Sequence, residues 1–128
     1  MTWSSQDVRW MTRALELASR GRFTTWPNPM VGCVVVQNER LLAEGWHRQH
    51  GEGHAEVYAL AQLAPSMDLS RVTAYVTLEP CSHTGKTPPC ADLLVSRGVG
   101  RVVVAMKDPN PLVAGRGLKR LQHAGAMC

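Results

Sequence analysis

The strongest constraint on the fold is the alternation of short apolar runs with segments of helical periodicity. Runs rich in β-branched residues predict strands at residues 30–36, 41–46, 73–78 and 101–106. Helical patterns occupy residues 54–63, 90–98 and 117–125. The first two runs, joined by the short QNER, predict an antiparallel hairpin, and the later alternation predicts crossovers and parallel pairing. We therefore expect an α/β fold of three layers, with helices on both faces of a mixed sheet.

A further helix is predicted near the N-terminus. Ser4 or Ser5 begins it, and Ser4 with Asp7 has the spacing of a capping box. The apolar residues of this segment that share one face are Val8, Met11, Leu15 and Ala18. Gly21 stands where a helix C-terminus favours a left-handed residue.

Size and composition indicate one globular domain spanning residues 1–128, with 45% apolar residues and no internal repeat. The polar N-terminus shows no secretory signal and no run is long enough to span a membrane, so we expect a cytoplasmic chain. The net charge of +4 is scattered, which argues against a nucleic-acid-binding arm but suits a phosphorylated small substrate as well as RNA. A strand expected after the last helix is missing, so we expect the sheet to be truncated there.

The two cysteines of TLEPCSHTGKTPPC allow more than one chemical role. Eight residues separate Cys81 from Cys90, whereas a zinc knuckle has two between its paired thiolates. A metal site, a disulfide loop and two unrelated cysteines in a Gly/Pro-rich turn all remain possible. In a cytoplasmic chain, reduced or metal-bound cysteines are favoured over a disulfide. Cys33, within an apolar run, is expected to be a small buried hydrophobe, and Cys128 is the terminal residue.

A histidine and a glutamate complete the pattern around those cysteines. His54 and Glu56 open one predicted helix, Cys81 follows a strand, and Cys90 opens the next helix. Both helix starts are expected over the carboxyl ends of the strands, where open α/β sheets bind ligands. One imidazole and two thiolates suit a zinc ion and leave a fourth position for water, which Glu56 can deprotonate. H-x-E followed by P-C and a further cysteine is the zinc-deaminase signature, here with a longer spacing.

The sequence resembles the deaminase domain of the bifunctional riboflavin-biosynthesis deaminase/reductase. The similarity covers nearly the whole chain and rests on NPMVGCVVV, HAEVYAL, YVTLEPCSHTGKTPPC and MKDPNPLVAGRG. It implies a cytidine-deaminase-like fold, a Zn²⁺ ion held by His54, Cys81 and Cys90, and Glu56 as the proton shuttle. It also implies hydrolytic deamination of 2,5-diamino-6-(5-phosphoribosylamino)pyrimidin-4-one to the aminouracil phosphate, with release of ammonia. The family's C-terminal, NADPH-dependent reductase domain is absent from these residues.

The resemblance further implies substrate-binding roles for five residues: Asn28, His47, Lys86, Asp108 and Asn110. Each has a plainer interpretation from local sequence alone. Asn28 between two prolines and the DPNP segment are typical turn formers, Lys86 could be a solvated lysine, and His47 could be an exposed histidine at a strand end. His50 or His83 could also complete a closed site of four ligands, but Glu56 would then have no water to activate.

Two other functions compete with a small-molecule deaminase. A tRNA-type base deaminase would use the same zinc chemistry, but the cysteine spacing and the aromatic content of only 5% argue against it. A non-catalytic structural zinc module would not need Glu56. We expect a small phosphorylated pyrimidine as the partner, with no nucleic acid and no membrane, and a homo-oligomer is possible.

Overall fold

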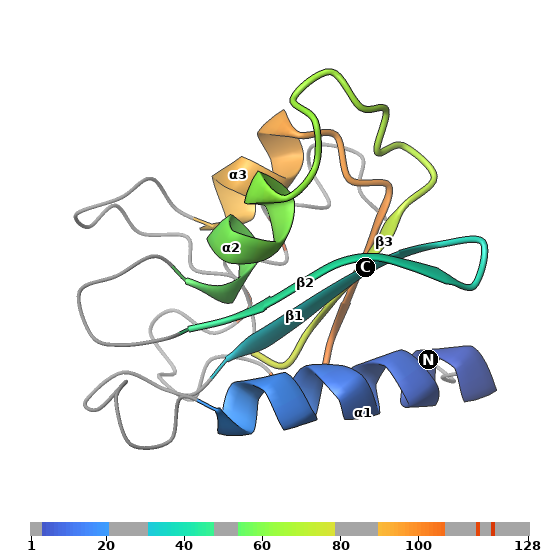
Figure 1. The fold of residues 1–128 in the computed structure, drawn as a ribbon, viewed down its shortest axis with the longest axis vertical. Helices are drawn as coiled ribbons and strands as arrows, with labels where there is room; N and C mark the ends of the chain where they lie inside the picture. The colour runs from blue at the N-terminus through green and yellow to red at the C-terminus, as the bar shows by residue number, and fades with distance from the viewer. Residues whose placement is uncertain are drawn as a thin grey trace.

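The computed structural model describes residues 4–20, 31–47, 54–78 and 90–106, together with Gly115 and Lys119. These residues form three helices and a four-stranded sheet (Figure 1). The helices are α1 (Ser5–Ser19), α2 (Ala55–Ala61) and α3 (Cys90–Ser96); the strands are β1 (Gly32–Gln37), β2 (Arg40–Trp46), β3 (Thr73–Val76) and β4 (Arg101–Val104). Each overlaps a segment predicted from the sequence. The helix predicted at 117–125 lies outside the described residues except for Lys119.

The sheet is mixed, as predicted, with the strand order β2-β1-β3-β4. β1 pairs antiparallel with both β2 and β3, while β3 and β4 are parallel. Asn38 and Glu39, both with positive φ (52° and 62°), make the two-residue turn between β1 and β2. Because β1 lies between β2 and β3, the connection through α2 crosses over β1.

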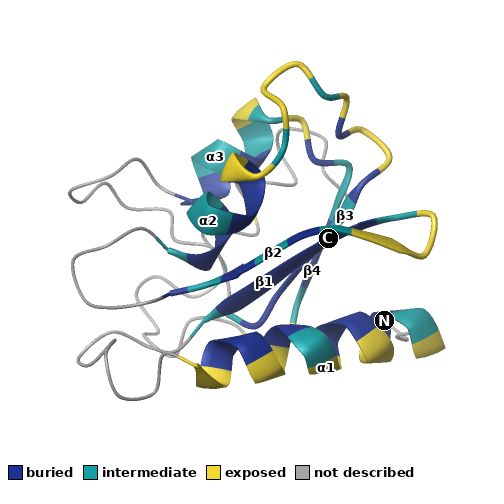
Figure 2. Ribbon diagram, viewed as in Figure 1, coloured by how far each residue is buried: buried dark blue, intermediate teal, exposed yellow. Residues whose placement is uncertain are grey.

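The three predicted layers are present, with α1 on one face of the sheet and α2 and α3 on the other (Figure 1). β1 contributes to the cores on both faces, and it is buried along most of its length (Figure 2). Cys33 and Val35 belong to the core beneath α2 and α3, whereas Val34 and Val36 belong to the core against α1. This double burial explains why the sequence of β1 is a continuous apolar run without polar alternation.

The capping box of α1 is confirmed, but its predicted apolar face is only partly correct. Ser4 Oγ accepts from the Asp7 backbone N–H and Asp7 accepts from the Ser4 N–H, both at 3.1 Å. Val8 and Leu15 are 52% and 53% exposed. The buried side of α1 is formed by Asp7, Trp10, Met11, Ala14, Leu17 and Ala18. The helix is turned this way because Asp7, a polar residue, has partners inside the fold. Gly21 lies outside the described residues.

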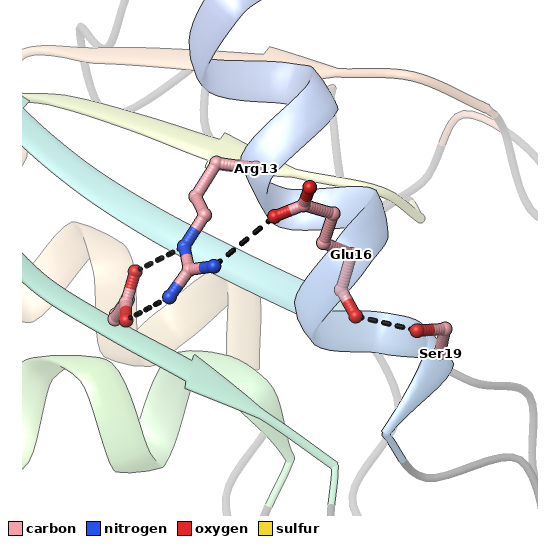
Figure 3. Close-up of polar contacts among 4 residues, drawn as sticks. Arg13, Glu16 and Ser19 are labelled. Atoms are coloured by element: carbon pink, nitrogen blue, oxygen red, sulfur yellow. Dashed lines mark hydrogen bonds and ion pairs between the residues drawn. The ribbon is translucent and has the colours of Figure 1, made fainter.

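α1 packs unusually close to the sheet. A Cβ atom on Gly32 would lie 1.9 Å from the Ala14 carbonyl oxygen, so only glycine fits at the start of β1. Arg13 of α1 reaches β2, where Nε and a terminal nitrogen donate to the two Glu44 carboxylate oxygens at 2.9 and 2.7 Å. Figure 3 shows Arg13 with its second, exposed partner Glu16. Among the described residues, no helix is both long and apolar enough to cross a membrane.

Candidate active site

His54 and Cys90 bring two helix starts together. His54 is the N-cap of α2, Cys90 is the first residue of α3, and Nδ1 of the imidazole lies 3.3 Å from the cysteine Sγ. Zinc–sulfur and zinc–nitrogen bonds of about 2.3 and 2.0 Å at a tetrahedral angle separate the two ligand atoms by about 3.5 Å. The observed separation is therefore close to that required by one shared zinc ion. Nδ1 is the nitrogen of the His54 ring that faces Cys90.

The burial of Cys90 at the start of α3 also agrees with a metal ligand. Its side chain is 1% exposed. A buried thiol beside an imidazole nitrogen is a soft donor pair of the kind that zinc prefers.

Glu56 lies in the first turn of α2, two residues after His54, and it is a buried carboxylate with 2% exposure. The negative charge of Glu56 acts on Cys33, on the side of β1 that faces α2 and α3. Burial, and secondarily the negative charge of Glu56, raises the pKa of the Cys33 thiol well above its ordinary value. Cys33 is consequently a neutral, apolar residue of the core, as predicted from the sequence, while Glu56 is a buried carboxylate two residues after His54.

His47 approaches the same site from the end of β2. Its ring centroid lies 5.2 Å from that of His54, and the two rings are perpendicular. The side chain is 1% exposed, so the interpretation of His47 as an exposed histidine is wrong. Four of the nine predicted site residues are described: His47 directly follows β2, His54 is the N-cap of α2, Glu56 lies in its first turn and Cys90 begins α3.

The other predicted site residues lie outside the described ranges. They are Asn28, Cys81, Lys86, Asp108 and Asn110, and the alternative ligands His50 and His83 are also outside. Within residues 4–20, 31–47, 54–78 and 90–106, no group of three or more metal-binding side chains is assembled. The observed part of the predicted zinc site is therefore the His54–Cys90 pair.

Two residues that support the site were not singled out from the sequence. A Cβ atom on Gly45 would lie 2.7 Å from the Ala55 carbonyl oxygen, so this glycine lets α2 approach β2. Thr77 Oγ1 accepts from the Gly32 N–H at 3.1 Å and the Thr77 N–H donates to the Gly32 carbonyl oxygen, also at 3.1 Å. These bonds fix the chain beyond β3, four residues before Cys81. A glycine inside a strand pattern signals a close backbone approach, whereas nothing local identifies Thr77.

The whole described site lies within a recognised family region. The family described as "Cytidine and deoxycytidylate deaminase zinc-binding region" matches residues 4–106. This match spans every described helix and strand and includes His54, Glu56 and Cys90. The chain belongs to the cytidine and deoxycytidylate deaminase family, and it is a deaminase domain with the fold expected from the resemblance.

Relatives identify the branch of that family. The riboflavin biosynthesis protein RibD of Escherichia coli is 60% identical over 120 residues, which are 94% of this chain and 32% of the relative. The diaminohydroxyphosphoribosylamino-pyrimidine deaminase of Buchnera aphidicola is 49% identical, over 94% of this chain and 80% of that protein. The structure of Acinetobacter baumannii RibD superposes with a TM-score of 0.90 at 54% identity, covering 95% of this chain and 34% of RibD. The chain spans about a third of the length of the RibD proteins and most of the Buchnera deaminase.

Proposed function

We propose that this chain catalyses the zinc-dependent hydrolytic deamination of 2,5-diamino-6-(5-phosphoribosylamino)pyrimidin-4-one in riboflavin biosynthesis. The observation that carries the proposal is the 3.3 Å approach of His54 Nδ1 to Cys90 Sγ, with Glu56 buried in the adjoining helix turn. The similarity to a Buchnera protein named for this deamination, over 80% of its length, supports the choice of substrate. In the reaction one water is consumed, the C2–amine bond breaks, a C2 carbonyl forms and ammonia leaves.

The proposed zinc ligands are His54, Cys90 and Cys81. The first two already stand at the separation that a shared metal requires. A zinc ion held by these residues would supply activation of water at neutral pH. Three protein ligands would leave a position for that water, unlike the ligand set of a closed structural site.

Glu56 is the proposed proton shuttle. Its carboxylate accepts a proton from the attacking water and donates it to the ring nitrogen, then accepts the remaining proton of the added hydroxyl and donates it to the departing amine. Since both protons that it accepts are passed on, the carboxylate returns to its starting state after each turnover. Its burial, with only 2% exposure, limits exchange of these protons with bulk water.

The substrate side of the site is proposed on the resemblance. Asn28, Lys86, Asp108 and Asn110 are the residues assigned to recognition of the pyrimidine, the ribose and the phosphate. His47, which is buried beside the ring of His54, is assigned with them. We further propose that residues 1–128 act as the deaminase unit next to a reductase partner, since the RibD relatives are about three times as long.

The test is ammonia release from the pyrimidine phosphate by the zinc-loaded protein, with a tRNA anticodon stem-loop as the competing substrate. Glu56→Gln is expected to lower kcat by about 100-fold or more with unchanged zinc content. Cys81→Ser and Cys90→Ser are expected to lose zinc, whereas Cys128→Ser, the matched control, keeps it. Activity on RNA alone, or unchanged turnover in Glu56→Gln, would overturn the proposal.

A further inference from the structure

Thr77 is the residue at which the chain leaves β3. It directly follows the strand, and the backbone bends at Thr77 and Leu78. Cys33 and Val76 are the last paired residues of β1 and β3 at this end of the sheet. The next step of their register places Thr77 opposite Gly32. In a regular antiparallel ladder, a hydrogen-bonded pair in this position exchanges two bonds, each from the N–H of one residue to the carbonyl oxygen of the other.

One of the two hydrogen bonds between Thr77 and Gly32 uses a side chain instead. The Thr77 N–H donates to the Gly32 carbonyl oxygen at 3.1 Å, as in a regular ladder. The Gly32 N–H donates to the Thr77 side-chain Oγ1, also at 3.1 Å. The hydroxyl oxygen therefore stands in for the Thr77 carbonyl oxygen. The backbone can turn out of the sheet at Thr77 while the N–H of Gly32, a buried residue, keeps an acceptor.

The two residues joined in this way adjoin two segments that are predicted to carry site residues. Cys81, the third proposed zinc ligand, follows Thr77 by four residues, and Asn28, assigned to substrate recognition, precedes Gly32 by four. Metal–ligand distances in a defined site hold to within about 0.2 Å. The chain that brings a ligand to the metal must therefore leave the sheet in one fixed direction.

We infer that Thr77 is a positioning residue for the zinc site, and that its hydroxyl fixes the direction in which the chain leaves β3 on the way to Cys81. This role rests on the proposed zinc-dependent deamination. The Thr77 side chain is 5% exposed, so water has little access to replace the hydroxyl as the acceptor. Gly32 cannot be varied, since a Cβ atom there would lie 1.9 Å from the Ala14 carbonyl oxygen. The bond is therefore tested from the Thr77 side.

Two substitutions separate the hydroxyl from the shape of the side chain. Thr77→Val keeps the shape but removes the oxygen, whereas Thr77→Ser keeps the hydroxyl. Zinc affinity is measured by competition with a chromophoric chelator, and unfolding in urea is followed for the same proteins. We expect Thr77→Val to weaken zinc binding about tenfold, at the lower end of the range of about 10- to 100-fold for groups that support metal ligands. Thr77→Ser, which retains the acceptor, should remain within about threefold of wild type.

Two control variants distinguish positioning from a general loss of stability. Thr73→Val makes the same substitution at the opposite end of β3 and should leave zinc affinity unchanged. Asp7→Asn breaks an ion pair with Arg101 on the α1 side of the sheet, so it should lower stability and also leave zinc affinity unchanged. A merely structural role for Thr77 predicts that Thr77→Val resembles Asp7→Asn, less stable but with wild-type zinc affinity. That result, or a Thr77→Ser variant that binds zinc as weakly as Thr77→Val, would contradict the positioning role.

A variant that does not fold leaves the test intact. If Thr77→Val does not fold, Thr77→Ala, which also lacks the hydroxyl, takes its place with the same expected result. Failure of the proposed function is distinguishable, because the wild-type protein itself would then bind no zinc or release no ammonia. If only the role of Thr77 is wrong, the wild-type protein binds zinc and releases ammonia, and Thr77→Val equals Thr73→Val in zinc affinity.

Discussion

The buried carboxylate of Asp7 is the group whose charge we expect to contribute most clearly to stability. Arg101 donates from two nitrogens to its two oxygens, each at 3.0 Å, and the Tyr75 hydroxyl donates to Oδ1 at 2.7 Å. Together with the capping bond from the Ser4 N–H, these contacts tie α1 to β3 and β4. The hydrogen bonds from Arg101 in particular hold the pKa of Asp7 well below its usual range.

Asp7→Asn keeps the size of the side chain but replaces one acceptor with an NH₂ group that cannot accept from Arg101. Removing one partner of a buried ion pair costs about 3–5 kcal/mol. The Arg101 side chain is 36% exposed and can still reach water, so we expect the lower end of that range, about 3 kcal/mol. In a domain of this size such a loss lowers Tm by roughly 12 °C.

Urea unfolding followed by circular dichroism measures the effect, with Glu16→Gln as the control. Glu16 is an exposed carboxylate of the same helix, and its pairing with Arg13 is expected to contribute less than about 1 kcal/mol. Because the pKa of Asp7 is depressed in the folded state, its stabilisation is complete at pH 7 and is lost as the pH falls below about 4. The gap between wild type and Asp7→Asn should close over the same pH range. Equal stabilities of Asp7→Asn and Glu16→Gln at pH 7 would refute this reasoning.

Three further predictions follow from single contacts. Gly45→Ala places a Cβ atom 2.7 Å from a backbone oxygen of α2, so we expect a lower Tm and a zinc affinity reduced at least threefold in a chelator titration. Arg97→Met removes two 3.1 Å hydrogen bonds to the carbonyl oxygens of Leu60 and Ala64, and should reduce the free energy of unfolding in urea by about 1–3 kcal/mol. Since burial raises the pKa of the Cys33 thiol, iodoacetamide at pH 8 should leave it unmodified in the folded protein but alkylate it in urea, as peptide mass spectrometry can show.

Local sequence patterns predicted the elements of the fold well because each pattern has a local physical cause. The Ser4–Asp7 capping box, the apolar run of β1 and the short turn at Asn38–Glu39 all depend on residues a few positions apart. The parallel pairing of β3 with β4 follows from the helix between them. The place of β1 between β2 and β3 was not predicted, because strand order depends on partners distant in sequence.

The dependence on partners distant in sequence also explains why the predicted buried face of α1 was partly wrong. Asp7 is buried because Arg101, 94 residues away, neutralises its charge. No pattern within the helix indicates that partner. Hydrophobic periodicity alone therefore selected Val8 and Leu15 for the core. At the candidate site, the H-x-E and cysteine pattern predicted roles for His54, Glu56 and Cys90, whereas the ring contact of His47 with His54 depends on the approach of α2 to β2.

The residues expected to stabilise the fold and those of the candidate site lie on opposite faces of the sheet. Asp7, Tyr75 and the core around α1 occupy one face of the sheet, while His54 and Cys90 belong to helices on the other (Figure 1). β1 connects the two faces through alternate side chains, and its backbone is fixed on both sides by strand pairing. A change confined to the α1 face should therefore lower the free energy of unfolding and leave zinc affinity and KM unchanged in the molecules that remain folded. A substitution at Gly45, on the site face, should instead change zinc affinity together with kcat.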